Sequence, residues 1–262
     1  RRWSTNKEAL IFRSGGLRIA TIRGIPIRLH FTFLIVLPAI VVGFARVFAD
    51  AARLAQVPAA ELGGPAWAWG LGVAIILFAS VLVHELAHAF YAVRHGGKVR
   101  DITLIMIGGM SRMTELPRAG REEMLMAAAG PATSLAIAAA LFGGYMLASE
   151  APWFNLRFAL FHLFTLNLFL GLFNLLPAFP MDGGRVLRGA LTKRLGLMRA
   201  TQVAATVGKL FGAAFGILGF LGMNFILMAI GFFVYFGAHA ETESVLAQAV
   251  LGGVRVRDLL IT

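Results

Sequence analysis

The feature that most constrains this chain is a series of long apolar runs. They occupy residues 29–49, 66–93, 124–147, 158–176 and 203–236. A helix needs about 20 apolar residues to cross roughly 30 Å of hydrocarbon, so each run can span a membrane. The last run is longer than one crossing requires, and the polar break at Gly222-Met223-Asn224 predicts two helices there. We therefore expect an all-α polytopic membrane protein with about six transmembrane helices.

Composition supports a membrane protein and narrows its chemistry. The 262 residues are 58% hydrophobic and 14% charged, whereas globular chains carry about 25% charged residues. This profile excludes a soluble enzyme and a disordered chain. The sequence has no cysteine, so a thiolate metal site is excluded and any metal must be held by His, Asp or Glu.

The positive charge is distributed unevenly among the loops. Seven basic residues precede the first apolar run, and the loop at 94–123 holds six, whereas the loop at 50–65 holds one. Such a bias is typical of cytoplasmic loops and not of a nucleic-acid footprint. We expect both termini to be cytoplasmic, the lipid bilayer to be the surrounding medium, and no nucleic acid to bind. Abundant Arg, Ala and Gly favour a prokaryotic plasma membrane.

Two stretches near the expected cytoplasmic side have the pattern of strands. Residues 17–29 alternate apolar and basic side chains around Gly24 and Pro26, and residues 99–113 are rich in β-branched side chains and broken by Gly108-Gly109. The sequence therefore predicts small β elements, a hairpin and a re-entrant loop, beside the helices.

Three segments follow from the positions of the apolar runs. We expect a cytoplasmic, juxtamembrane segment at 1–28, a transmembrane core at 29–240 and a cytoplasmic linker at 241–262.

The second apolar run contains the motif His84-Glu85-Leu86-Ala87-His88. Residues four apart share one face of a helix, so both histidines can bind one zinc ion, and Glu85 can act as general base. Along a helix, His84 lies about 20 Å from Leu71 in the first half of the run and about 14 Å from its end at Val93. A chance match is a poor explanation inside a bilayer, where each ionisable group costs about 2.5 kcal/mol or more unless it is paired, hydrated or metal-bound.

A catalytic zinc site needs a third protein ligand and an open fourth position. Asp182 is the best candidate, because it follows the fourth apolar run in a segment with Pro177, Pro180 and Gly183-Gly184. This composition predicts a non-helical segment at the depth of the metal. The alternative is that Asp182 only caps the following helix.

These motifs together resemble the site-2 protease family of intramembrane zinc metalloproteases. The resemblance rests on HExxH within a transmembrane run, and on NxxPxxPxDG with Asn174 and Asp182 eight residues apart. The Gly108-Gly109 pair and Ala129-Gly130-Pro131 match further. Ser134 departs from the family pattern, which has Asn there, and we expect this difference to affect helix packing.

The resemblance implies a zinc metalloendopeptidase that hydrolyses peptide bonds in or near transmembrane segments of membrane proteins, as in regulated intramembrane proteolysis. It implies one zinc ion per chain held by His84, His88 and Asp182, with Glu85 as base. It also implies that Asn174 helps to hold the substrate or the oxyanion, although the residues alone equally favour an interhelical hydrogen bond.

Two partners follow from the same reading. A substrate helix must unwind before attack, and residues 99–113 can receive the unwound stretch by β-augmentation. Residues 254–262 (VRVRDLLIT) resemble the opening strand of a CBS domain, which implies a nucleotide-sensing module in a longer chain.

Three other functions fit parts of the pattern. A ZIP-like divalent-metal transporter would use Glu85 as a metal ligand and needs a second ligand cluster, which the sequence before His84 does not offer. A catalytically inactive membrane scaffold has no need of Glu85. A zinc protease of the CAAX-processing type would take a Glu on a later helix as its third ligand.

Overall fold

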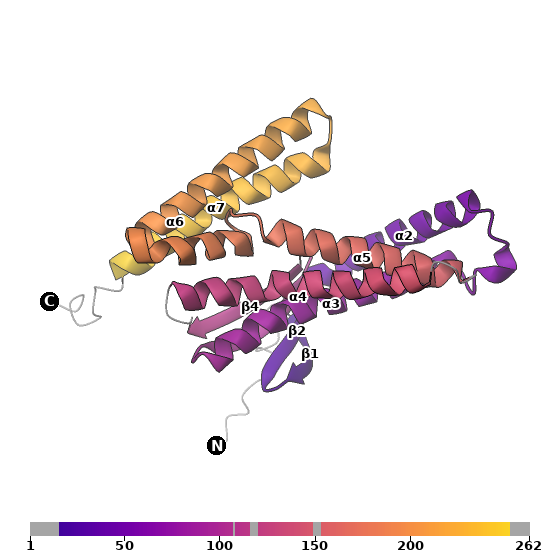
Figure 1. Cartoon of the computed structure of the whole chain (residues 1–262), viewed down its shortest axis with the longest axis horizontal. Coiled ribbons are helices and arrows are strands. Elements are labelled where there is room, and N and C mark those ends of the chain that lie inside the picture. Colours follow the sequence, from indigo (N-terminus) through magenta and orange to yellow (C-terminus); the bar gives the residue numbers. More distant parts are fainter. Residues whose placement is uncertain (1–15, 107, 116–119, 149–152, 252–262) are drawn as a thin grey trace, which may run out of the picture. The chain divides into compact units, whose positions relative to one another are not determined.

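The computed structural model describes residues 16–106, 108–115, 120–148 and 153–251. Within these residues, six helices are long and apolar enough to cross a membrane, which confirms the predicted fold class. They are α2 (Phe31–Leu54), α3 (Ala66–Arg94), α4 (Arg121–Leu147), α5 (Phe154–Asn174), α6 (Asp182–Leu221) and α7 (Phe225–Leu251) (Figure 1).

The predicted break in the last apolar run is the turn between α6 and α7. Helix α6 ends at Leu221, and the Asn224 side chain accepts a hydrogen bond from the Leu227 N–H at 3.0 Å. This bond satisfies one of the unpaired N–H groups at the start of α7.

Both stretches predicted to be extended form strands of one sheet. The strands are β1 (Gly16–Ile22), β2 (Ile25–His30), β3 (Lys98–Ile105) and β4 (Gly108–Glu115), in the order β1-β2-β3-β4. Strands β2 and β3 are parallel, and the other two pairs are antiparallel. Arg23 and Gly24 both have positive φ, as a tight hairpin turn between β1 and β2 requires.

The chain divides into two compact units. The first comprises residues 1–116 and 132–171, and so holds the sheet, α2, α3, most of α4 and nearly all of α5. The second comprises residues 117–131 and 172–262, and holds the first turns of α4 together with α6 and α7.

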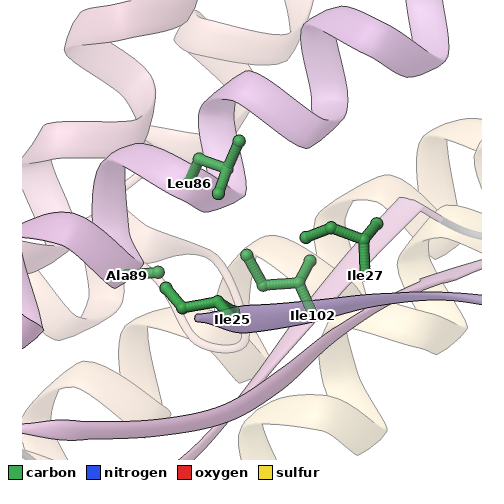
Figure 2. Close-up of a cluster of buried hydrophobic side chains, with 5 residues drawn as sticks. All are labelled: Ile25, Ile27, Leu86, Ala89 and Ile102. Carbon is green, nitrogen blue, oxygen red and sulfur yellow. The ribbon is translucent and has the colours of Figure 1, made fainter. Parts of the chain in front are cut away.

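In the first unit, α3 packs on the sheet through a buried apolar cluster. Figure 2 shows Leu86 and Ala89 of α3 beside Ile25 and Ile27 of β2 and Ile102 of β3. Leu86 is the middle residue of the HExxH motif. Because successive helical residues are about 100° apart, burying Leu86 against the sheet fixes the directions of the residues on either side of it.

Helices α2 and α3 approach each other closely in the same unit. A Cβ atom on Gly70 would lie 2.3 Å from the Val41 carbonyl oxygen, so only glycine fits there. Nearby, the Phe48 and Trp69 rings stack with their centroids 5.6 Å apart. Both contacts hold the part of α3 that precedes the HExxH motif.

In the second unit, α6 and α7 form a helical hairpin (Figure 1). Glycines lie at the close contacts: a Cβ on Gly212 would lie 2.7 Å from the Tyr235 nitrogen, and a Cβ on Gly231 would lie 2.5 Å from the Gly216 nitrogen. Helix α6 is bent at Gly196, where φ is 76° and the backbone is not helical. Two helical segments therefore meet at this glycine.

The expected terminal segments are only partly described. Residues 1–15 and the CBS-like stretch 254–262 lie outside the described residues. Helix α7 continues through the expected boundary at residue 241 and runs to Leu251.

Candidate metal centre and catalytic site

Helix α3 places the two motif histidines side by side in a buried position. His84 is 3% exposed and His88 is 6% exposed, and their Nε2 atoms lie 3.2 Å apart. Two nitrogens bound at about 2.0–2.1 Å to one tetrahedral zinc ion lie about 3.3 Å apart. The spacing and the chemistry of this donor pair therefore fit a zinc site, as predicted from the i, i+4 spacing.

The other nitrogen of His84 contacts the next helix of the same unit. Its Nδ1 atom lies 2.9 Å from the Ser134 hydroxyl oxygen on α4, and Ser134 is completely buried. From the sequence, Ser134 was expected to affect helix packing only, and its contact with His84 was not predicted. The 50 residues between the two positions carry no pattern that pairs them.

Glu85 points to a different side of α3 and meets strand β4. The Ser111 hydroxyl donates a hydrogen bond to Glu85 Oε2 at 2.6 Å. Gly109, on the same strand, lies so close that a Cβ there would be 2.3 Å from Glu85 Cγ. The predicted Gly108-Gly109 break therefore has a structural reason. Strand β4 can pass close to the Glu85 side chain only because residue 109 has no side chain of its own.

The second unit carries the other two predicted site residues. Asn174 is the last residue of α5, and Asp182 is the first residue of α6; both are half-buried. The prediction that Asp182 lies on a non-helical segment is wrong, because Asp182 is the first residue of α6. Asp182 is not the N-cap either: Met181 holds that position and makes no side-chain capping bond.

The loop between Asn174 and Asp182 folds back tightly on the start of α6. A Cβ on Gly183 would lie 2.1 Å from the Leu176 oxygen, and one on Gly184 would lie 2.5 Å from the Phe179 nitrogen. The two glycines are thus needed for backbone contact, as the sequence indicated.

A buried ionic cluster, not predicted from the sequence, lies beside this loop in the second unit. Arg188 of α6 donates to Glu123 of α4 at 2.8 Å and to Glu241 of α7 at 2.9 Å. Its guanidinium carbon also lies 5.0 Å from the ring centroid of Phe179 in the loop. We call Arg188, Glu123 and Glu241 the Arg188 cluster.

A family model for peptidase family M50 matches residues 72–155 and 145–218. These residues make up more than half of the chain and include both the HExxH motif and the loop before Asp182. The chain belongs to peptidase family M50.

Individual relatives match between about half and nearly all of the chain. A zinc metalloprotease of Methanocaldococcus jannaschii is 35% identical over 93% of this chain and 66% of its own length. Stage IV sporulation protein FB of Bacillus subtilis is 32% identical over 49% of this chain and 43% of its own length. The solved structure of a site-2 protease from Methanocaldococcus jannaschii has a TM-score of 0.57 and 36% identity, covering 87% of this chain and 95% of that one.

The curated M50 relatives are longer than this chain. The chain spans between 43% and 66% of the length of the ones that it matches.

Proposed function

We propose that this M50 chain is an intramembrane zinc endopeptidase that cleaves membrane-protein substrates in or near their transmembrane segments. The observation that carries the proposal is the arrangement on α3. Two buried histidine nitrogens lie at the spacing of one zinc ion, and a carboxylate beside them is held by β4. The names of the matched relatives, which include a zinc metalloprotease and a site-2 protease, support it.

Asp182 completes the proposed ligand set. Catalytic zinc is bound by three protein ligands, and His84, His88 and Asp182 each offer one ligand atom. One carboxylate with two imidazoles leaves a fourth position open. We assign one zinc ion per chain to this set.

In the proposed reaction, a bound zinc ion supplies Lewis acidity to the scissile carbonyl and brings the pKa of a water ligand to about 7. Glu85 accepts the proton of the attacking water and returns it to the departing amine. The Ser111 hydroxyl donates to Oε2 of Glu85 and so holds the carboxylate in place for this proton transfer. Asn174 holds the substrate or the developing oxyanion with its side-chain amide.

Strand β4 is the proposed docking edge for an unwound substrate. In the sheet order, β3 is paired on both sides, so within residues 99–113 only β4 has an edge that no other described strand covers. Gly109 and Ser111 of β4 contact Glu85, and a substrate strand added to this edge therefore lies near the base.

A pair of proline variants tests this docking. Residues an odd number apart on a strand direct their N–H groups to opposite edges. Of Met110 and Met113, one therefore directs its N–H to the free edge of β4, and proline at that position removes this N–H. We expect one of the two to reduce cleavage while Met110→Ala and Met113→Ala do not. Full cleavage by both proline variants contradicts docking on β4.

We propose a multi-pass topology in a prokaryotic plasma membrane, with both termini cytoplasmic. The loop charges support this orientation, and an even number of spans returns the chain to the side on which it began. A nucleotide-sensing CBS domain after residue 262 of a longer chain belongs to the same proposal.

The decisive experiment uses the purified protein in lipid nanodiscs. The probe is a panel of single-span peptides with Asn, Gly or Pro inside the apolar segment, with products identified by mass spectrometry and zinc content by elemental analysis. We expect one zinc ion per chain, cleavage by the native protein and no cleavage by Glu85→Gln. Zinc flux into proteoliposomes that depends on Glu85 establishes a transporter instead. Zinc-free protein without cleavage establishes a scaffold.

A further inference from the structure

We propose that Ser134 is a positioning residue of the metal centre, which selects the tautomer of His84 that can bind zinc. The inference rests on the proposed zinc site and concerns a residue outside the ligand set, at a position where this chain departs from the family pattern. Ser134 itself touches neither metal nor substrate in this proposal.

The two ring nitrogens of His84 have different roles. A neutral imidazole carries one hydrogen, either on Nδ1 or on Nε2, and only the nitrogen without it can bind a metal. Nε2 of His84 faces Nε2 of His88 at 3.2 Å, so Nε2 is the metal-binding atom and Nδ1 must carry the hydrogen. Ser134 Oγ, 2.9 Å from Nδ1, accepts that hydrogen.

Without the hydroxyl, the balance between the tautomers reverses. An N–H on Nδ1 would be buried with its Ser134 acceptor gone, which is unfavourable. A hydrogen on Nε2 would instead bond to Nε2 of His88 across the same 3.2 Å gap. In that arrangement Nε2 of His84 carries a hydrogen and donates it to the lone pair on Nε2 of His88, so neither nitrogen can bind zinc. Ser134 therefore favours the metal-ready arrangement over a self-paired one.

The fold supplies an internal control. Ser80 lies on α3 one turn before His84 and is 6% exposed. Its hydroxyl donates to the Ile76 carbonyl at 3.0 Å and accepts from Asn167 at 3.3 Å. Ser80→Ala removes the same hydroxyl at a neighbouring buried position without touching the Nδ1 contact of His84.

The first measurement is zinc affinity, by competition with a colorimetric chelator in nanodiscs. Losing a hydrogen-bond partner of a ligating histidine lowers metal affinity 10–100-fold, and we expect a loss in this range for Ser134→Ala. Ser134→Thr keeps a hydroxyl and restores the affinity, and Ser80→Ala stays within about threefold of the native protein. Native affinity in Ser134→Ala overturns the proposal.

The second measurement needs no zinc. Nitrogen-15 NMR of labelled histidine in the zinc-free protein separates Nδ1–H from Nε2–H tautomers. We expect Nδ1–H at His84 in the native protein and in Ser80→Ala, and Nε2–H in Ser134→Ala. The same tautomer in all three proteins overturns the proposal. If the native protein binds no zinc, the proposed function fails while this measurement still decides the role of Ser134.

Discussion

Two of the buried polar clusters in this membrane protein, the Arg188 cluster and the histidine pair on α3, differ in how their charges are arranged. In the Arg188 cluster a positive group meets two negative ones, so the charges compensate one another. On α3, two lone-pair donors of the same character face each other across 3.2 Å. The first cluster holds charges of opposite sign, whereas the second presents two nitrogens at the spacing of ligands to one cation.

The Arg188 cluster and the polar residues of the HExxH motif differ in which parts of the molecule they contact. The Arg188 cluster joins three helices, α4, α6 and α7, and contacts Phe179 in the loop before Asp182. The α3 group contacts Ser134 on α4 and Ser111 on β4. We therefore expect substitutions in the first to act on stability and substitutions in the second to act on catalysis.

The largest expected effect is on catalysis, from Glu85→Gln. Removing a general base lowers the rate of cleavage by about 10²–10⁴-fold, while zinc binding and the unfolding temperature stay unchanged. Peptide cleavage and elemental analysis measure the two quantities. Glu243→Gln on the exposed part of α7 is the matched control. Loss of zinc in Glu85→Gln would show that Glu85 is a metal ligand and would contradict its assignment as the general base.

Arg188→Ala tests whether the Arg188 cluster stabilises the fold. It leaves buried Glu123 without its cation, and we expect the free energy of unfolding to fall by about 3–5 kcal/mol. Titration with SDS, followed by circular dichroism, measures this change. Replacing all three members by apolar residues should recover much of the stability. If Arg188→Ala is as stable as the native protein, the cluster is not structural.

Gly109→Ala tests whether β4 sets the position of Glu85. The added methyl group would lie 2.3 Å from Glu85 Cγ and must displace it. A displacement of about 1 Å in a catalytic group can lower the rate by about 100-fold, so we expect a loss of that size with zinc retained. Gly143→Ala is the control, because a Cβ there meets no atom within 4 Å. Equal cleavage by Gly109→Ala and Gly143→Ala contradicts this role of β4.

Ser111→Ala should have the smallest effect. It removes one hydrogen bond to the Glu85 carboxylate and leaves the strand in place. A bond of this kind contributes about 1.4 kcal/mol, which corresponds to a tenfold loss of cleavage. A steady-state assay with the same peptides measures it. A loss as large as that of Glu85→Gln would mean that Ser111 takes part in the reaction itself.

Features that depend on residue spacing within one helix or strand were predictable from the sequence. Apolar runs gave the six helices, alternation and glycines gave the four strands, and the i, i+4 spacing gave the pairing of His84 with His88. Each depends on residues within one element, where helix and strand geometry determine the spacing.

Contacts between distant residues were not predictable in this way. Ser134 lies 50 residues from His84, and Ser111 lies 26 residues from Glu85. Arg188 and Glu123 look like ordinary surface charges in the sequence, because nothing local says that they are buried. Asp182 was placed outside a helix because prolines and glycines suggested a longer loop than the tight turn that the close backbone contacts of Gly183 produce.

The junction of β2 with α2 has a mechanical consequence. Strand β2 ends at His30 and α2 begins at Phe31, with the His30 ring accepting the Thr32 N–H at 3.3 Å. No loop separates them, so the sheet and the 24-residue helix move together as a lever about 36 Å long. A tilt of about 10° at the sheet then shifts the far end of α2 by about 6 Å, roughly the width of a side chain. If a substrate strand adds to β4 as proposed, a tilt of the sheet on docking would move the far end of α2 laterally within the bilayer.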